Sequence, residues 1–149
     1  MRLAVLAVAL VLLSGCMHAM RDSAEVEHFP MANDPEGKLP FADVVRAGKF
    51  LFQSGKLGID PATMKLVPGG IQPETRQTME LIKAGFARHG VGMERVVKCT
   101  VFLADMKEWG AMNEVYLQYF PAGKPARSAL GASGLALGAR VEIECIAAL

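Results

Sequence analysis

Residues 140–147 read Arg-Val-Glu-Ile-Glu-Cys-Ile-Ala, and their strict alternation decides the fold of this chain. In an extended segment, one face holds every second residue from Val141 to Ala147, and all of these are apolar. The other face holds Arg140, Glu142, Glu144 and Ile146. The pattern predicts a strand with a hydrophobic core on one side and a mixed face on the other.

A second strand is predicted over residues 95–104, where apolar and mixed positions alternate in the same way. The apolar series is Val97, Cys99, Val101 and Leu103, and the series between them is Lys98, Thr100 and Phe102. A short strand over 126–130 follows, and small residues over 131–138 connect it to 140–147.

Two helices are predicted between these strands. The first begins near Pro73, where Glu74 suits the positive end of a helix, and it ends at Gly90. The second extends from Trp109 to Phe120 and stops at Pro121. Each has one apolar stripe, and we assign its methionine and aromatic residues to the core: Met79, Ile82, Phe86, Trp109, Met112, Tyr116 and Phe120.

The start of the domain favours a hairpin, with a strand over 49–54 and its partner at 44–45. A short extended piece at 65–67 lies between turn signals. The element order is therefore ββαβαββ, which predicts an α+β fold built as a two-layer sandwich. The mixed sheet face carrying Phe102, Glu142 and Ile146 is too apolar for solvent, so we expect another subunit to cover it.

Composition excludes several classes of protein. The 149 residues are 52% hydrophobic with a formal charge of +1, which suits one globular domain and gives no general attraction for nucleic-acid phosphates. Metal-binding and nucleotide-binding motifs are absent from the sequence, so neither a metal site nor a cofactor is predicted. Cys99 and Cys145 fall on apolar strand faces, where buried inert thiols are the common case and a disulfide is the alternative.

The first residues resemble a bacterial lipoprotein signal peptide. Arg2 precedes the apolar run 3–13, and Leu13-Ser14-Gly15-Cys16 resembles a lipobox. We therefore expect a signal peptide over 1–15, a lipidated Cys16 with a flexible tether over 16–38, and a folded domain over 39–149. This predicts a lipid-anchored protein of the bacterial cell envelope, at the outer membrane if the source is Gram-negative, with the lipid anchor as its only membrane contact.

Arg127 and Glu142 are the candidate catalytic residues. A planar guanidinium can bind a substrate carboxylate, and a nearby carboxylate can handle a water molecule. On spacing alone, a structural salt bridge between the two is the stronger interpretation.

A resemblance to a known family favours catalytic roles for Arg127 and Glu142 over a structural salt bridge. Seven collinear stretches from about Leu39 to the end resemble the Rid family, also called YjgF, of reactive intermediate deaminases. They are 49–60, 75–77, 98–105, 112–116, 120–121, 125–128 and 141–144. The resemblance implies a chorismate-mutase-like fold and a homotrimer with active sites in clefts between subunits. It also implies cofactor-independent hydrolysis of 2-imino and enamine acids to 2-oxo acids and ammonia.

The resemblance also assigns residues. It implies that Arg127 binds the substrate carboxylate, that Glu142 positions the attacking water, and that Ser54, Gly55 and Asn113 contribute to the pocket. Two substrate-pocket positions depart from the family pattern: Phe41 stands where a tyrosine is usual, and Ala129 where a cysteine is usual. A non-catalytic envelope protein that holds a small carboxylate in the same clefts is the alternative hypothesis.

Overall fold

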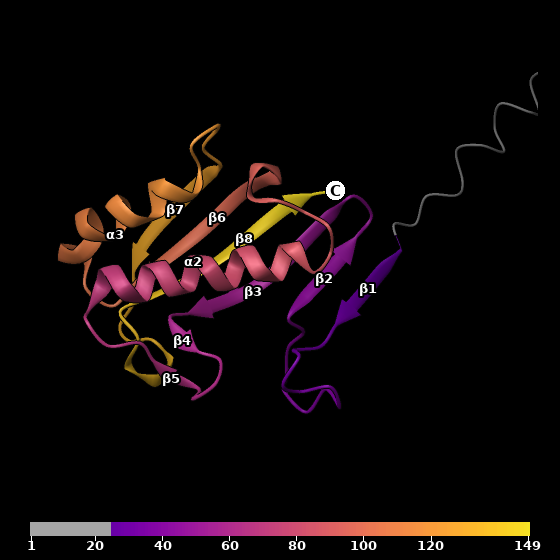
Figure 1. Cartoon of the computed structure of the whole chain (residues 1–149), viewed down its shortest axis with the longest axis horizontal. Helices are drawn as coiled ribbons and strands as arrows, with labels where there is room; N and C mark the ends of the chain where they lie inside the picture. The colour runs from indigo at the N-terminus through magenta and orange to yellow at the C-terminus, as the bar shows by residue number, and fades with distance from the viewer. Residues whose placement is uncertain (1–24) are drawn as a thin grey trace, which may run out of the picture.

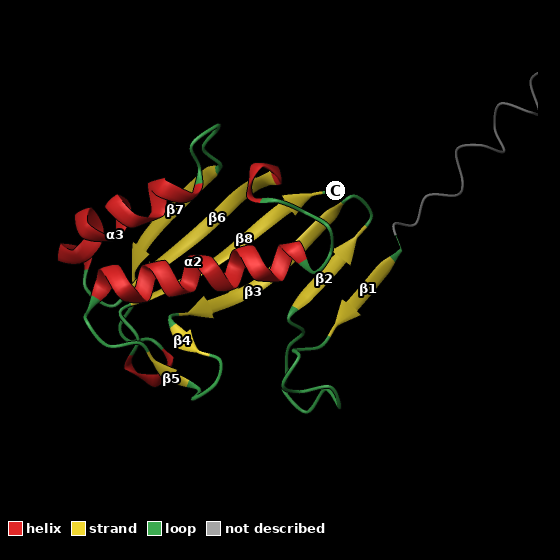
Figure 2. Cartoon of the chain, in the orientation of Figure 1, coloured by secondary structure: helices red, strands yellow, loops and turns green. Residues whose placement is uncertain are grey.

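Residues 25–149 fold as two α-helices on one face of a mixed six-stranded sheet (Figures 1 and 2). The computed structural model describes residues 25–149. The strand order is β1-β2-β3-β8-β6-β7, and β4 and β5 form a separate hairpin. The bounds are β1 Val26–Phe29, β2 Val44–Ala47, β3 Phe50–Leu57, β4 Ile59–Asp60, β5 Lys65–Leu66, α2 Ile71–Ala87, β6 Val96–Leu103, α3 Trp109–Tyr116, β7 Ala126–Gly131 and β8 Val141–Ala148. Short 3-10 turns cover Met93–Arg95, Met106–Glu108, Leu117–Tyr119 and Ala136–Gly138.

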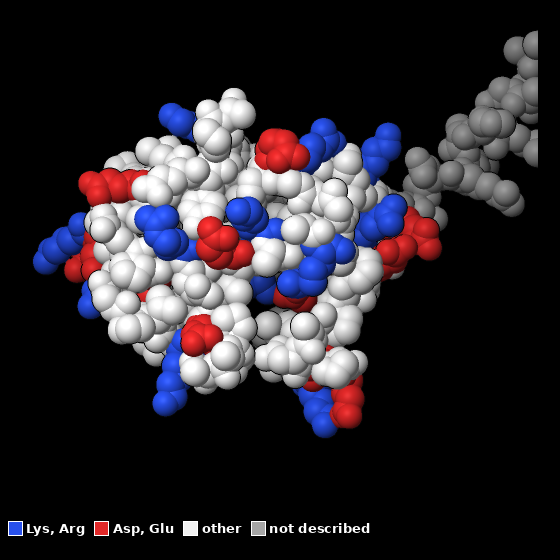
Figure 3. All heavy atoms as spheres, in the orientation of Figure 1, with Lys and Arg blue, Asp and Glu red and all other residues white. Residues whose placement is uncertain are grey.

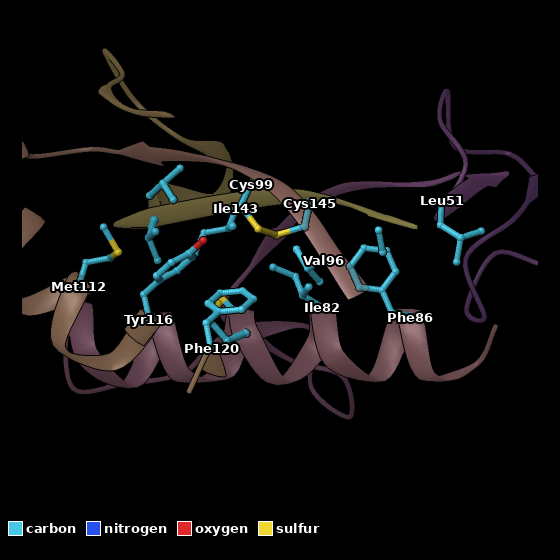
Figure 4. Close-up of a cluster of buried hydrophobic side chains, with 14 of the residues drawn as sticks. Leu51, Ile82, Phe86, Val96, Cys99, Met112, Tyr116, Phe120, Ile143 and Cys145 are labelled. Atoms are coloured by element: carbon cyan, nitrogen blue, oxygen red, sulfur yellow. A yellow bond between two sulfur atoms is a disulfide. The ribbon is translucent and has the colours of Figure 1, made fainter. Parts of the chain in front are cut away.

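Strand β8 occupies the centre of the sheet, as its alternation suggests. It pairs antiparallel with β3 on one side and with β6 on the other. The side chains of Val141, Ile143, Cys145 and Ala147 are buried beneath the helices. They pack with residues such as Ile82 and Phe86 of α2 and Met112 of α3 (Figure 4). The predicted α+β architecture is therefore confirmed.

The predicted face of one strand residue is wrong. Val97 was placed with Cys99 on the core face, but it is 43% exposed, whereas Val96 is buried. The register between β6 and β8 shifts between Val96 and Lys98. Such a bulge inserts one residue into the strand and breaks the period of two, so Val96 takes the core position.

The sheet begins earlier than the sequence indicates. Strand β1 pairs antiparallel with β2, from Val26 opposite Ala47 to Phe29 opposite Val44. This strand lies inside the segment 16–38 that was expected to be a tether. Its four residues are too few to show a clear alternation, and Pro30 follows directly. The expected signal peptide and Cys16 lie outside the described residues.

Cys99 and Cys145 form a disulfide across the β6–β8 pair (Figure 4). The two residues are directly opposite each other in the antiparallel register, with a Cα–Cα distance of 4.1 Å. Both are buried, at 0% and 1% exposure. The interpretation of two inert thiols is corrected: strands far apart in the sequence bring the sulfur atoms together.

The disulfide is expected to stabilise the domain measurably. It closes a loop of 46 residues, so its removal should cost about 4 kcal/mol of unfolding free energy. The double variant Cys99→Ala/Cys145→Ala tests this in urea unfolding against the oxidised wild type, with the slope of the transition checked as well. Equal unfolding free energies for the two proteins would contradict a stabilising disulfide.

The face of the sheet opposite the helices is uncovered within residues 25–149. It carries large apolar side chains in contact with solvent, including Phe52 at 42% exposure and Phe50 at 45%. Glu142, Glu144 and Ile146 of β8 share this face because they alternate with the buried residues. We call this surface the open face.

A candidate active site divided between two faces of the sheet

Arg127 lies on the edge strand β7 and points to the helix side of the sheet. Its register partner in the parallel β6–β7 pair is Cys99, whose side chain lies in the core. The guanidinium reaches α3, where its Nη1 donates a 2.6 Å hydrogen bond to Oδ1 of Asn113. The structure therefore joins two of the predicted site residues, and Arg127 remains half-buried.

Two aromatic rings of α3 flank the same guanidinium. The Cζ atom of Arg127 is 4.8 Å from the ring centroid of Tyr116 and 5.7 Å from that of Trp109. Both distances fall within the range of cation–π attraction. The sequence assigned both aromatic residues to the core, which is confirmed for Tyr116 at 3% exposure but wrong for Trp109, which is 42% exposed beside Arg127. Their spacing with Asn113, at 109, 113 and 116, is the signal that places all three on one helix face.

Glu142 lies on β8 and points to the open face. In the antiparallel β6–β8 pair it is opposite Phe102, and in the β3–β8 pair it is opposite Leu57. Gly55 is directly beside it, because a Cβ atom built on Gly55 would overlap Oε1 of Glu142. A glycine at this position therefore gives the carboxylate the room that it occupies.

The surroundings of Glu142 disfavour its ionised form. Desolvation by burial raises the pKa of its carboxyl, and the charge of Glu144 on the same face raises this pKa further. A carboxylate whose pKa is above its ordinary value is a better proton acceptor once it is ionised. Glu142 is thus suited to receive a proton from a water molecule.

Ser54 and Gly55 lie where the register of β3 against β8 shifts, between Gln53 and Lys56. The hydroxyl of Ser54 donates a 2.6 Å hydrogen bond to the carbonyl of Ala42, and its backbone N–H donates to the carbonyl of Asp43. The irregularity takes Gly55 out of regular pairing and places it beside Glu142.

A buried ionic group lies under this irregular segment. The ammonium of Lys56 pairs with Oδ1 of Asp43, and Arg88, the residue just after α2, donates to Oδ2 of Asp43 at 2.5 Å. Lys56 and Asp43 are 8% and 4% exposed. The carboxylate of Asp43, just before β2, thus links β3 at Lys56 to the C-terminal end of α2, next to the pocket residues Ser54 and Gly55.

The two departures from the family pattern lie in different places. Phe41 precedes β2 and is 51% exposed, one residue from the carbonyl that Ser54 binds. Ala129 lies on β7, two residues after Arg127, and packs against the core from a half-buried position. The structure therefore puts Phe41 next to Ala42, the residue that Ser54 binds, and Ala129 on the same side of β7 as Arg127.

Arg127 and Glu142 do not meet within one chain. Arg127 aligns with core-facing Cys99, whereas Glu142 alternates with core-facing Val141 and Ile143, so the two side chains leave opposite faces of the sheet. A structural salt bridge between them is therefore excluded in the single chain. Two half-sites result, one with Arg127 and Asn113 and one with Glu142 and Gly55, which follows Ser54 in the chain.

Among residues 25–149, the surface on the helix side of the sheet shows no patch made only of acidic or only of basic side chains (Figure 3). Acidic and basic side chains are interspersed over the face that carries α2 and α3 (Figure 3). Within residues 25–149 the fold thus presents the guanidinium of Arg127 on one face of the sheet and the carboxylate of Glu142 on the other.

Comparisons with known proteins agree with this architecture. The family model described as Endoribonuclease L-PSP matches residues 31–149. The chain is 44% identical over 115 residues to the RutC family protein PH0854 of Pyrococcus horikoshii, covering 77% of this chain and 91% of that protein. It is 40% identical over 108 residues to the 2-iminobutanoate/2-iminopropanoate deaminase of Mus musculus, covering 72% and 80%.

Solved structures match as well. The conserved Rid family protein YyfA of Yersinia pestis superposes with a TM-score of 0.77 at 32% identity, over 84% of this chain and all (100%) of that one. The TdcF protein of E. coli with bound serine gives a TM-score of 0.72 at 30% identity, over 87% and 99%. The chain belongs to the Rid/YjgF family, which also includes proteins described as L-PSP and RutC.

Proposed function

We propose that this protein hydrolyses reactive 2-imino and enamine acids to 2-oxo acids and ammonia. The similarity to mammalian 2-iminobutanoate/2-iminopropanoate deaminases supports this class of substrate. The observation that carries the proposal is the presence of both required groups: an arginine held without an acidic partner among residues 25–149, and a half-buried carboxylate with a raised pKa.

The proposed reaction uses each half-site for one task. Arg127 binds the substrate carboxylate through two parallel N–H donors, which fixes the adjacent C=N bond. Glu142 takes a proton from a water molecule as the water oxygen bonds to the imine carbon, and it passes this proton to the imine nitrogen to give a carbinolamine. Glu142 then takes the hydroxyl proton of the carbinolamine and delivers it to the amino group as the C–N bond breaks, so that ammonia leaves and the C=O bond of the 2-oxo acid forms.

Because the two groups leave opposite faces of the sheet, we propose that the working site forms between chains. One subunit would supply Arg127 and the next would supply Glu142 in a closed homotrimer. The exposed Phe50 and Phe52 on the open face support this assembly, because a large uncovered apolar surface favours association.

Light scattering on the protein without its first 21 residues is expected to give three times the protomer mass. The reason is that burial of the open face outweighs the entropy of association at working concentrations. A monomer at micromolar concentration would contradict the assembly and would also leave the active site incomplete.

The localisation proposal follows from the N-terminal sequence. We propose export and lipid attachment at Cys16, which would place the enzyme on the bacterial cell envelope. The Cys99–Cys145 disulfide supports export, because disulfides persist in oxidising compartments. Among residues 25–149, no helix has the length and apolar character required to cross a bilayer.

Replacing the proposed lipidated residue tests the attachment. Cys16→Ala is expected to prevent both acylation and cleavage, because the sulfur atom of Cys16 would carry the lipid. Labelled palmitate should be incorporated into the wild type in its native bacterium and should be absent from the variant. Wild-type protein without labelled palmitate would refute lipid attachment while leaving the enzymatic proposal standing.

The direct test of function is the hydrolysis of freshly generated 2-iminobutanoate. The protein is expected to accelerate formation of 2-oxobutanoate over the spontaneous rate, in proportion to its concentration. If imines with several different side chains show no acceleration while 2-oxobutanoate still binds, the protein is a carboxylate-binding protein and not a deaminase.

A further inference from the structure

The guanidinium of Arg127 contacts three residues on one side of α3, Trp109, Asn113 and Tyr116, which we call the corner. Trp109, Asn113 and Tyr116 are spaced by four and three residues, so their side chains project from the same side of the helix. All three contact Arg127: the rings at 5.7 and 4.8 Å from Cζ, and the amide oxygen at 2.6 Å from Nη1. This side of α3 therefore holds the guanidinium of Arg127 through three separate contacts.

The corner leaves the charge of Arg127 available. Among residues 25–149, Arg127 forms no ion pair with an aspartate or glutamate. Burial raises the pKa of the Tyr116 hydroxyl to about 12, although the charge of Arg127 acts in the opposite direction. Tyr116 therefore remains neutral at physiological pH and attracts the guanidinium through its ring, not as a counter-ion.

The hydroxyl of Tyr116 has no hydrogen-bond partner among the described residues. The contribution of Tyr116 to the corner consequently comes from the aromatic ring. Asn113 uses one N–H group of a guanidinium that carries five, so the remaining donors can bind both oxygens of a carboxylate. A long arginine side chain on an edge strand otherwise loses considerable rotamer freedom when it binds a ligand.

We propose that Trp109 and Tyr116 are positioning residues that hold the guanidinium of Arg127 for the substrate carboxylate without neutralising it. This inference rests on the proposed role of Arg127 in carboxylate binding. It predicts that the rings matter for affinity and the hydroxyl does not. Because the contact acts on substrate and transition state alike, KM should change more than kcat.

The test measures calorimetric binding of 2-oxobutanoate and steady-state kinetics with 2-iminobutanoate on the disulfide-bonded protein. Trp109 is 42% exposed, so Trp109→Leu should fold normally. It is expected to weaken 2-oxobutanoate binding by about five-fold and raise KM similarly, with kcat within about two-fold. Trp109→Phe, which keeps a ring, should restore most of the affinity.

Further variants separate this role from packing. Tyr116→Phe keeps the ring and Tyr116→Leu removes it, so the first variant should bind 2-oxobutanoate more tightly than the second. Leu117→Ala truncates a 45% exposed apolar residue just after α3 and should also leave affinity unchanged. A Trp109→Leu protein that binds like the wild type, or a Trp109→Phe protein that binds no better than Trp109→Leu, would overturn the positioning role.

The outcomes distinguish this inference from the proposed function. If imine hydrolysis is accelerated but Trp109→Leu has no effect, the positioning role fails and the deaminase proposal stands. If 2-oxobutanoate binding depends on Arg127 and Trp109 but imine hydrolysis is not accelerated, the deaminase proposal fails and the positioning role stands.

Discussion

Arg127→Ala is expected to lower kcat/KM for 2-iminobutanoate by about 10³-fold or more, because it removes two charge-assisted hydrogen bonds to the substrate carboxylate. Arg127→Lys should also impair turnover, by roughly 10-fold to 100-fold, since an ammonium cannot reproduce the planar pair of donors. The coupled assay that detects 2-oxobutanoate measures both variants.

The control for Arg127 is an arginine with no place in the site. Arg46→Ala removes an exposed guanidinium of β2 whose ion-pair contact with Glu27 is 3.7 Å long, and its activity should match the wild type. Circular dichroism and light scattering should show that the Arg127 variants retain fold and assembly. An Arg127→Ala protein as active as the wild type would refute the deaminase mechanism.

Glu142→Gln is expected to have the second large effect on catalytic activity. The amide keeps the shape of the side chain but cannot accept a proton from water, so kcat should fall by on the order of 10²-fold with little change in 2-oxobutanoate binding. Glu144→Gln, on the same strand and the same face, is the matched control when kcat is compared at a pH above the acidic limb of the pH–rate profile. Wild-type kcat in Glu142→Gln would remove Glu142 from the chemistry.

The raised pKa of Glu142 adds a pH signature. The reaction needs the ionised carboxylate, so activity should fall as pH decreases, and the fall should begin at a higher pH than an ordinary glutamate would give. Part of the increase in pKa comes from the charge of Glu144, so Glu144→Gln should move this acidic limb of the pH–rate profile to lower pH.

The raised pKa of Glu142 also affects the free energy of unfolding: the ionised carboxylate, which the reaction needs, is the less stable form in the folded protein. Since the folded-state pKa lies above the unfolded value, the favourable contribution of protonated Glu142 is present at low pH and is lost as pH rises through the folded pKa. At neutral pH, Glu142→Gln should therefore unfold at the same or a higher temperature than the wild type. This difference should vanish below the unfolded pKa, where the glutamate is itself neutral.

The sequence predicts strands and helices well where the period is long and one face is clearly apolar. Strand β8 and helix α2 are of this kind, with residues such as Ile143 and Phe86 buried as expected. Strand β1 was missed because four residues carry too little periodicity. The face of Val97 was wrong because a bulge depends on the partner strand as well as on the local sequence.

The side of the sheet on which each site residue lies was harder to predict from the sequence. Alternation on β7 gives no clear core face, because Arg127 and Ala129 alternate with Ser128 and Leu130, and neither pair is wholly apolar or wholly polar. The register of β7 against β6 and the contacts with α3 show that Arg127 points to the helix side. The disulfide likewise depends on a register between residues 46 positions apart.

The central claim is that Arg127 of one subunit and Glu142 of another form each active site, and mixed assemblies test it most directly. Arg127→Ala and Glu142→Gln chains can be co-expressed with different affinity tags and purified through both tags, so that every trimer contains both variants. In a closed three-membered ring, such a trimer regains one intact site, so the account predicts about one third of the wild-type imine hydrolysis rate. Activity no higher than that of either variant alone, in trimers shown to contain both chains, would contradict it.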